Sequence, residues 1–158
     1  MIALARLDAL PLLAALFTKV WVTETVLAEC MAGGERSESR NIREALALGH
    51  LQARPVPDVA PAWAVDVGEA SAIAAALELG GGVVMDDRAG RRFAARMGLP
   101  VIGALGVLVL AKRAGRVAEI RPLVQALTDS GYYLAGSVVE KALELAGEAS
   151  AAPVGKPT

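Results

Sequence analysis

Two adjacent aspartates, Asp86 and Asp87, carry the clearest chemical signal in the sequence. They follow the apolar run Val83 to Met85, which predicts a short buried strand, and they precede a predicted helix. Ligands of open parallel sheets bind at the carboxyl ends of the strands, so a site is expected here. The pair is also favourable as a helix N-cap, because carboxylates accept hydrogen bonds from free backbone N–H groups, and this structural alternative stays open.

Two glutamates add to this signal, because Glu29 and Glu69 each lie on an otherwise apolar predicted helix. Two carboxylates about 4 Å apart repel by roughly 4 kcal/mol at an effective dielectric near 20, so converging acids require a cation or a raised pKa. The sequence has one histidine and one cysteine, which excludes a Cys/His zinc site and leaves oxygen ligands. The expected cation is therefore Mg²⁺ or Mn²⁺.

Composition predicts one compact domain in a reducing compartment. The chain has 158 residues, of which 54% are hydrophobic and 4% aromatic, which favours helices of small aliphatic residues packed on a sheet. The net charge of -1 gives no sign of a nucleic-acid partner, although a local basic face is compatible with it. The single cysteine excludes an internal disulfide, and the longest apolar run, Val101 to Ala111, is shorter than the roughly 20 residues that cross a bilayer. We expect a cytoplasmic protein without a membrane segment.

Hydrophobic periodicity predicts helices that alternate with short strands, which is typical of an α/β fold with a parallel sheet. The predicted helices cover residues 1–17, 23–31, 41–49, 68–79, 88–97, 105–113, 119–128 and 137–146, and the predicted strands cover 19–22, 50–54, 83–85 and 99–102, with a brief extended segment at 132–134. Thr23 is the expected N-cap of the second helix, and Pro55 to Pro61 is an expected loop. The tail Ala149–Thr158 is predicted to be disordered.

Several runs of this sequence resemble a little-characterised branch of the PIN-domain superfamily. They are Gly68-Glu-Ala-Ser-Ala-Ile-Ala-Ala-Ala76, Val84-Met-Asp-Asp-Arg-Ala-Gly-Arg-Arg-Phe-Ala94, Val101-Ile-Gly-Ala-Leu-Gly-Val-Leu108, Ala111-Lys-Arg-Ala-Gly-Arg-Val117, Gly131-Tyr-Tyr-Leu and Ala142-Leu-Glu-Leu-Ala-Gly147. The likeness keeps order and spacing over residues 1–148. It implies a three-layer α/β/α fold with a central parallel sheet in one domain, residues 1–148.

The resemblance also implies a function, a metal-dependent endoribonuclease. Carried over residue by residue, Glu29 matches the family's glutamate on the helix after the second strand, Glu69 the acid that opens the later helix, and Asp86 or Asp87 the strand-end aspartate. These four residues are the expected catalytic and metal-binding set, with Mg²⁺ or Mn²⁺ as cofactor and RNA as substrate. A toxin of a toxin–antitoxin pair, inhibited by a small antitoxin protein, and a homodimer are both compatible with the family.

One departure from the family pattern affects this expectation. The family usually opens with a short central strand and an aspartate, whereas this sequence begins at Met1 with what looks like the following helix. Asp8 is a poor substitute for that acid. Two explanations stay open: a translation start placed too far downstream, which we favour because the rest of the chain shows no sign of decay, and a truncated, inactive remnant. The alternative function is therefore a catalytically inactive PIN-like domain that binds nucleic acid or protein.

A row of arginines is the expected RNA-binding surface. Arg88, Arg92 and Arg96 recur every four positions on the helix after the aspartates, so they share one face that can hold RNA phosphates. An ordinary solvated helix face explains the same spacing. Arg91 lies on another face and is expected to have a structural role beside the acids. A phosphoryl-accepting receiver domain also places acids at a strand end, but it needs a lysine after a later strand, and Lys112 lies inside a predicted helix.

Overall fold

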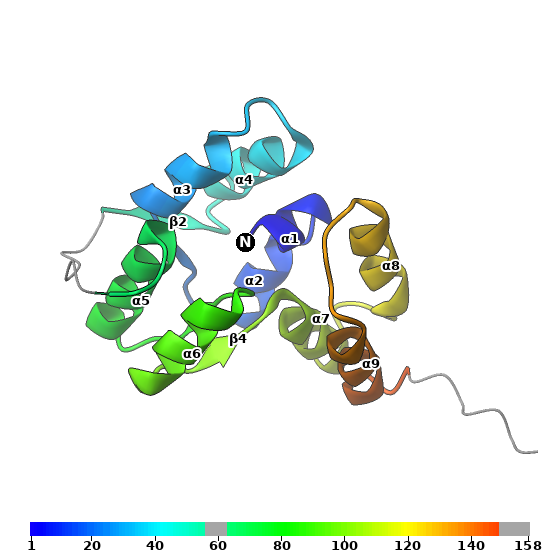
Figure 1. Ribbon diagram of the computed structural model, residues 1–158. Coiled ribbons are helices and arrows are strands. Elements are labelled where there is room, and N and C mark those ends of the chain that lie inside the picture. Colours follow the sequence, from blue (N-terminus) through cyan, green and yellow to red (C-terminus); the bar gives the residue numbers. More distant parts are fainter. Residues whose placement is uncertain (56–62, 149–158) are drawn as a thin grey trace, which may run out of the picture.

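A computed structural model of the chain describes residues 1–55 and 63–148 (Figure 1). The helices are α1 (Ile2–Arg6), α2 (Pro11–Leu16), α3 (Glu24–Met31), α4 (Ser37–Ala47), α5 (Val67–Leu79), α6 (Arg88–Arg96), α7 (Ala104–Arg113), α8 (Arg121–Asp129) and α9 (Gly136–Leu145). The strands are β1 (Trp21–Thr23), β2 (Gln52–Arg54), β3 (Val83–Val84) and β4 (Val101–Ile102). Most of the predicted loop Pro55–Pro61 and the predicted disordered tail Ala149–Thr158 lie outside the described residues.

The α/β fold with parallel strands is confirmed, but the strands of the described residues form two separate pairs. Strand β1 pairs in parallel with β2, with Trp21 opposite Gln52, and β3 pairs in parallel with β4, with Val83 opposite Val101. Helix α1 packs on α4 and helix α2 on α7, so these two short helices connect the two halves of the fold. Figure 1 shows α1 and α2 near the middle of the molecule, with α3, α4 and α5 on one side of them and α7, α8 and α9 on the other.

The first segment differs from the prediction of one amphipathic helix over residues 1–17. It forms α1 and α2, which are separated at Asp8, where the backbone adopts a positive φ of 51°. Pro11 occupies the first turn of α2, where its missing N–H leaves no hydrogen bond unmade. The interruption turns the two helices so that Leu4, Leu10 and Leu13 are all buried in the same core.

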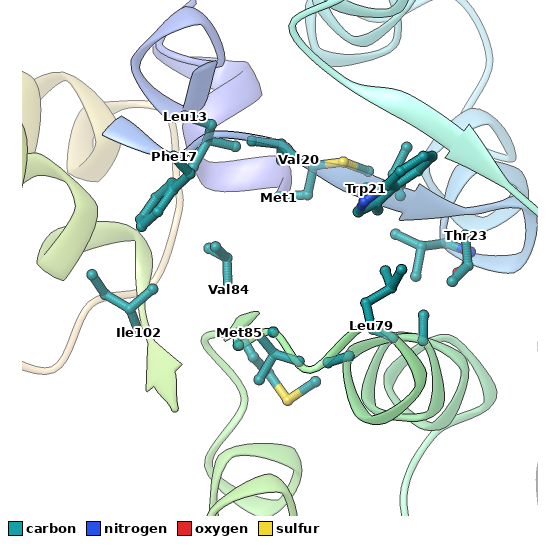
Figure 2. A pocket seen from close by; sticks show the side chains of 18 of the residues that line it. Met1, Leu13, Phe17, Val20, Trp21, Thr23, Leu79, Val84, Met85 and Ile102 are labelled. Atoms are coloured by element: carbon teal, nitrogen blue, oxygen red, sulfur yellow. The ribbon is translucent and has the colours of Figure 1, made fainter. Parts of the chain in front are cut away.

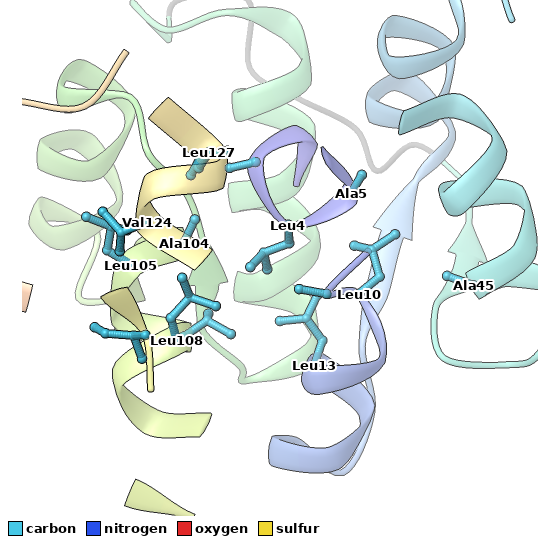
Figure 3. Close-up of a cluster of buried hydrophobic side chains, with 14 of the residues drawn as sticks. Leu4, Ala5, Leu10, Leu13, Ala45, Ala104, Leu105, Leu108, Val124 and Leu127 are labelled. Atoms are coloured by element: carbon cyan, nitrogen blue, oxygen red, sulfur yellow. The ribbon is translucent and has the colours of Figure 1, made fainter. Parts of the chain in front are cut away.

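The main core joins the short N-terminal helices to the C-terminal ones. Leu4, Leu10 and Leu13 pack in one cluster with Leu105 and Leu108, as Figure 3 shows. A smaller cluster around β3 and α6 comprises Ile73, Ala76, Val83, Met85 and Ala94. Leucine, isoleucine, valine and alanine make up most of both clusters, which agrees with the low aromatic content of the chain.

Local signals in the sequence set the ends of several elements. Thr23 is the N-cap of α3, as predicted, and its side chain accepts a hydrogen bond from the backbone N–H of Val26. The buried Thr23 hydroxyl also lies 2.7 Å from the Ser71 hydroxyl of α5, which ties α3 and α5 together. Helix α5 ends at Gly80, whose φ of 63° is the left-handed conformation that glycine adopts readily. Residues 132–134 do not form a strand.

None of the helices in the described residues is long and apolar enough to cross a membrane.

Candidate active site

The side chain of Asp87 caps helix α6. Its Oδ2 atom accepts hydrogen bonds from the backbone N–H groups of Ala89 at 2.6 Å and Gly90 at 2.9 Å. The bond from Gly90 is the main cause that lowers the pKa of Asp87, and the charge of Arg92 acts in the same direction. Asp87 is therefore a fixed carboxylate that stays ionised at neutral pH, and both capping bonds use only one of its oxygens.

The side chain of Asp86 faces different partners. Its Oδ1 accepts a hydrogen bond from the backbone N–H of Ala104, the first residue of α7, at 2.8 Å, and its Oδ2 accepts one from the hydroxyl of Tyr132 at 3.3 Å. Burial, and then the charge of Asp86 and this hydrogen bond, raise the pKa of Tyr132 to about 12, so the phenol remains a donor. Asp86 thus connects the end of β3 to α7 and to the loop after α8.

Asp87 shares a pocket of about 380 Å³ with two other acids, Asp66 and Glu69. Burial raises the pKa of Glu69, and the charges of Asp87, Asp66 and Glu29 raise it further. The four carboxylates are therefore close enough for their charges to interact. Asp66 was not among the site residues predicted from the sequence. Its position three residues before Glu69 nevertheless matches the spacing of a helix capping box.

Two glycines allow the glutamates to approach the backbone. A Cβ at Gly90 would lie 2.8 Å from Oε2 of Glu69, and a Cβ at Gly68 would lie 2.2 Å from Oε2 of Glu29. Real side chains do not tolerate such contacts, so each carboxylate occupies space that only glycine leaves free. Glu29 thereby reaches from α3 to the start of α5, where Glu69 lies.

The donor set fits a hard divalent cation that keeps part of its water shell. Within residues 1–55 and 63–148, no group of three histidines, cysteines, aspartates or glutamates is close enough to hold a metal ion directly. Mg²⁺, however, is commonly bound through one or two carboxylates and several waters. Burial is the first cause of the raised pKa of Glu69 and the charge of Asp87 is the next, and a bound cation would relieve the repulsion between these two acids.

The predicted arginine row lies on α6, next to this pocket. Arg88, Arg92 and Arg96 are all exposed, and the charge of Arg92 acts on Asp87. The Arg96 guanidinium lies 5.6 Å from the centre of the Phe93 ring. Arg91 is half-buried and donates a hydrogen bond of 2.8 Å to the backbone carbonyl of Met85, which is a structural contact beside the acids.

The helices alternate with short parallel strands, and the acids gather where β3 ends and where α5 and α6 begin. These features define an α/β protein with an acidic site at the carboxyl edge of its strands. A family model described as PIN domain matches residues 1–148, and the chain belongs to the PIN-domain family. PIN domains form a nuclease-type superfamily whose members generally depend on divalent metal ions, and PIN-domain nucleases bind RNA. No curated protein and no solved structure matches the chain.

Proposed function

We propose that this protein is a metal-dependent endoribonuclease that hydrolyses RNA phosphodiester bonds. The observation that carries the proposal is the shared pocket of Glu69 and Asp87, in which the pKa of Glu69 is raised by burial and by the neighbouring acids. Perturbed carboxyl groups that converge in a pocket are typical of functional sites. Family membership supplies the reaction class, since PIN domains belong to a nuclease-type superfamily.

Each acid has a distinct part in this proposal. Glu69 and Asp87 would hold Mg²⁺ or Mn²⁺, with Glu29 next to them, and the bound ion would supply an activated water and stabilisation of negative charge on the phosphate. The capping bonds from Ala89 and Gly90 fix the Asp87 carboxylate before substrate binds. Asp86, predicted in the same set, is assigned a positioning role, because both of its oxygens already accept hydrogen bonds.

The arginine row of α6 would hold the RNA backbone. Arg92 acts on Asp87 through its charge and Arg88 directly follows that aspartate, so a phosphate bound by these side chains would lie beside the acidic pocket. Arg96, one turn further along, would contact the next part of the strand. Phosphate contacts of this kind position the substrate and carry no sequence information.

The proposal extends to a biological role as the toxin of a toxin–antitoxin pair, regulated by a small antitoxin protein. A neighbouring gene for a short DNA-binding protein would support this role, and a solitary gene would count against it. A homodimer is a further proposal, and it rests on analogy with the family alone.

The test is Mn²⁺-dependent cleavage of a structured RNA by this chain and by the double variant Asp86→Asn with Asp87→Asn. We expect cleavage by the unmodified chain and its loss in the variant. Asparagine keeps the size of the side chain and its ability to accept capping bonds, so the variant should fold. An absence of cleavage by both proteins would contradict the proposal for this chain.

The second candidate function is a catalytically inactive PIN-like domain that binds nucleic acid or protein. The observation that favours it is the absence, within the described residues, of three acids close enough to hold one ion. Mn²⁺ affinity discriminates between the two functions. An inactive domain should bind Mn²⁺ no more tightly than the variant with both aspartates changed to asparagine, whereas a nuclease should bind it more tightly.

A further inference from the structure

A tryptophan lies beside the acids of the candidate site. Trp63 lines the pocket of about 380 Å³ together with Asp66, Glu69 and Asp87. Its side chain is only half-buried, although tryptophan is the largest apolar side chain. Part of the indole ring is therefore open toward the place where a metal-bound phosphate would lie.

The indole of Trp63 is held in place by a second aromatic ring. The centres of the Trp63 and Phe93 rings are 5.2 Å apart, and their planes are inclined by 51°, which is a favourable arrangement for two aromatic side chains. Both rings pack against the smaller core cluster around β3 and α6. The orientation of the indole is thus fixed before any ligand binds, which lowers the entropic cost of stacking another ring on it.

Helix α6 carries both this aromatic support and the arginine row. Ala89, Phe93 and Arg96 follow one another at spacings of four and three, so they share one face of the helix. Ala89 lines the pocket with Trp63, and the guanidinium of Arg96 lies 5.6 Å from the centre of the Phe93 ring. Arg96 also ends the arginine row that would hold the RNA backbone. A phosphate held by that row would therefore have its sugar and base next to Trp63.

The pocket has room for more than a metal ion. Six waters around Mg²⁺ occupy about 180 Å³, at about 30 Å³ for each water. The volume of about 380 Å³ therefore leaves about half of the pocket for another group. The walls other than the acids are apolar, and they are formed by Trp63, Ala64, Val65 and Ala89. Such walls suit a flat, uncharged ring.

We propose that Trp63 is a stacking platform for a purine base of the RNA, at the nucleotide next to the cleaved bond. The base would cover the open part of the indole while the arginines of α6 hold the backbone phosphates. A purine has two fused rings and covers more of an indole than the single ring of a pyrimidine does, so the subsite favours adenine and guanine. The inference rests on the proposed function, which supplies RNA as the ligand, and it adds a binding residue and a base preference.

The two tryptophans of the chain provide a matched pair of reporters. Trp21→Phe leaves Trp63 as the only tryptophan, and Trp63→Phe leaves Trp21. Trp21 is 38% exposed, and it lines another pocket of about 920 Å³ between the two strand pairs, as Figure 2 shows. It is the first residue of β1, so it lies at the amino end of that strand, whereas the acids gather at the carboxyl ends. Trp21 is therefore the control for Trp63.

The first test is a fluorescence titration with a single-stranded RNA hexamer of alternating adenine and uracil. Metal is left out, so that the RNA stays intact. A base stacked on an indole quenches its emission, so we expect quenching in the protein that keeps Trp63 and none in the protein that keeps Trp21. Hexauridine should bind the protein that keeps Trp63 at least about threefold more weakly. Absence of quenching at Trp63, or equal quenching of both tryptophans, would overturn the proposal.

The second test separates stacking from packing. Trp63→Leu keeps an apolar side chain against Phe93 but removes the platform, so the affinity for the adenine–uracil hexamer should fall at least about fivefold. The preference for this hexamer over hexauridine should disappear. Trp63→Phe keeps a smaller ring, and it should retain part of the preference at the melting temperature of the parent. A preference that persists unchanged in both variants would overturn the proposal, and the phenylalanine variant decides alone if the leucine variant does not fold.

A metal titration distinguishes this inference from the nuclease proposal. Trp63 offers no oxygen ligand, so Trp63→Leu should bind Mn²⁺ within about twofold of the parent. Quenching at Trp63 in a chain that neither binds Mn²⁺ nor cleaves RNA would support the base platform and contradict only the nuclease. Mn²⁺-dependent cleavage without quenching and without a purine preference would contradict only the platform.

Discussion

The carboxylate of Glu29 lies directly over Gly68, so that a Cβ at Gly68 would fall 2.2 Å from Oε2 of Glu29. Glycine at this buried position of α5 is therefore what allows an acid from α3 to reach the start of α5. The contact involves the flexible end of the glutamate side chain, so a larger residue at position 68 displaces the acid without disturbing the backbone.

The variant Gly68→Ala should therefore weaken metal binding without lowering stability. Alanine favours a helix over glycine by about 1 kcal/mol, so the melting temperature should stay within a few degrees of the parent or rise. We expect Mn²⁺ affinity, measured by isothermal titration calorimetry, to fall by about tenfold. Gly136→Ala is the matched control, because nothing lies within 4 Å of a Cβ at that position. An unchanged affinity in Gly68→Ala would show that Glu29 does not contribute to the ion.

The two adjacent aspartates should respond differently to substitution. Asp87→Asn keeps the capping of α6 but removes the charge that faces Glu69, so Mn²⁺ affinity should fall by more than about tenfold with little change in stability. Asp86→Asn keeps an acceptor for Ala104 N–H and should leave the affinity within about threefold. Titration of both single variants with Mn²⁺ measures the difference. A larger loss in the Asp86 variant would reverse the assignment.

The raised pKa of Glu69 leads to a pH-dependent effect on stability. The folded protein binds this proton more tightly than the unfolded chain, so the group favours folding below its ordinary pKa of 4.5, and this contribution is lost as the pH rises through the folded pKa. We therefore expect Glu69→Gln to be more stable than the parent near pH 7, and the difference to vanish on acidification below pH 4.5. Chemical denaturation at several pH values, with Glu144→Gln as an exposed control, measures it.

A stability test away from the site concerns Glu148, the last residue that the PIN-domain family model matches. Its carboxylate accepts hydrogen bonds from Lys112 Nζ at 2.6 Å and from the backbone N–H groups of Ile120 at 2.7 Å and Arg121 at 2.8 Å. Burial alone would raise the pKa of Glu148, but these donors lower it, with Lys112 first among them. Its stabilising effect is therefore present above the unfolded pKa and lost as the pH falls through the folded one.

We expect Glu148→Ala to reduce the free energy of unfolding by about 2 kcal/mol at neutral pH, because it leaves several donors without their charged acceptor. Denaturant titration gives this value. Glu144→Ala is the control: Glu144 pairs with Lys141 at the surface, where both side chains are more than half exposed, and should change stability by less than about 0.5 kcal/mol. Equal effects of the two substitutions would refute the structural role of Glu148.

The arginine row can be tested through the salt dependence of RNA binding. The affinity for a single strand falls with salt, and each phosphate contact contributes about −0.7 to the slope of log affinity against log salt. Changing Arg88, Arg92 and Arg96 together to glutamine should therefore make the slope less steep by about 2. Filter binding measures this slope, and the variant with both aspartates changed to asparagine serves as the background so that the RNA is not cleaved. Arg116→Gln, on an exposed residue after α7, is the control. An unchanged slope would favour the ordinary solvated helix face.

Much of the fold could be predicted because its signals are local. The apolar run before Asp86, the glycine that ends α5 and the cap at Thr23 each depend on neighbours within a few residues, and the structure places the elements close to the predicted ranges. The prediction of one helix over residues 1–17 was wrong for a related reason. Leucines recur regularly from Leu4 to Leu16, and this pattern continues across the break at Asp8, where the backbone changes direction.

The sequence by itself determined which acids end or begin the elements of the candidate site, because periodicity and capping fix where strands stop and helices start. Only the tertiary structure decided which of them share a pocket. Asp86 is held by Ala104 and by Tyr132, 18 and 46 residues further along the chain, whereas Asp87 faces Glu69 and the unforeseen Asp66. The direction of a side chain depends on partners brought together by folding, and these distant contacts have no local signature in the sequence.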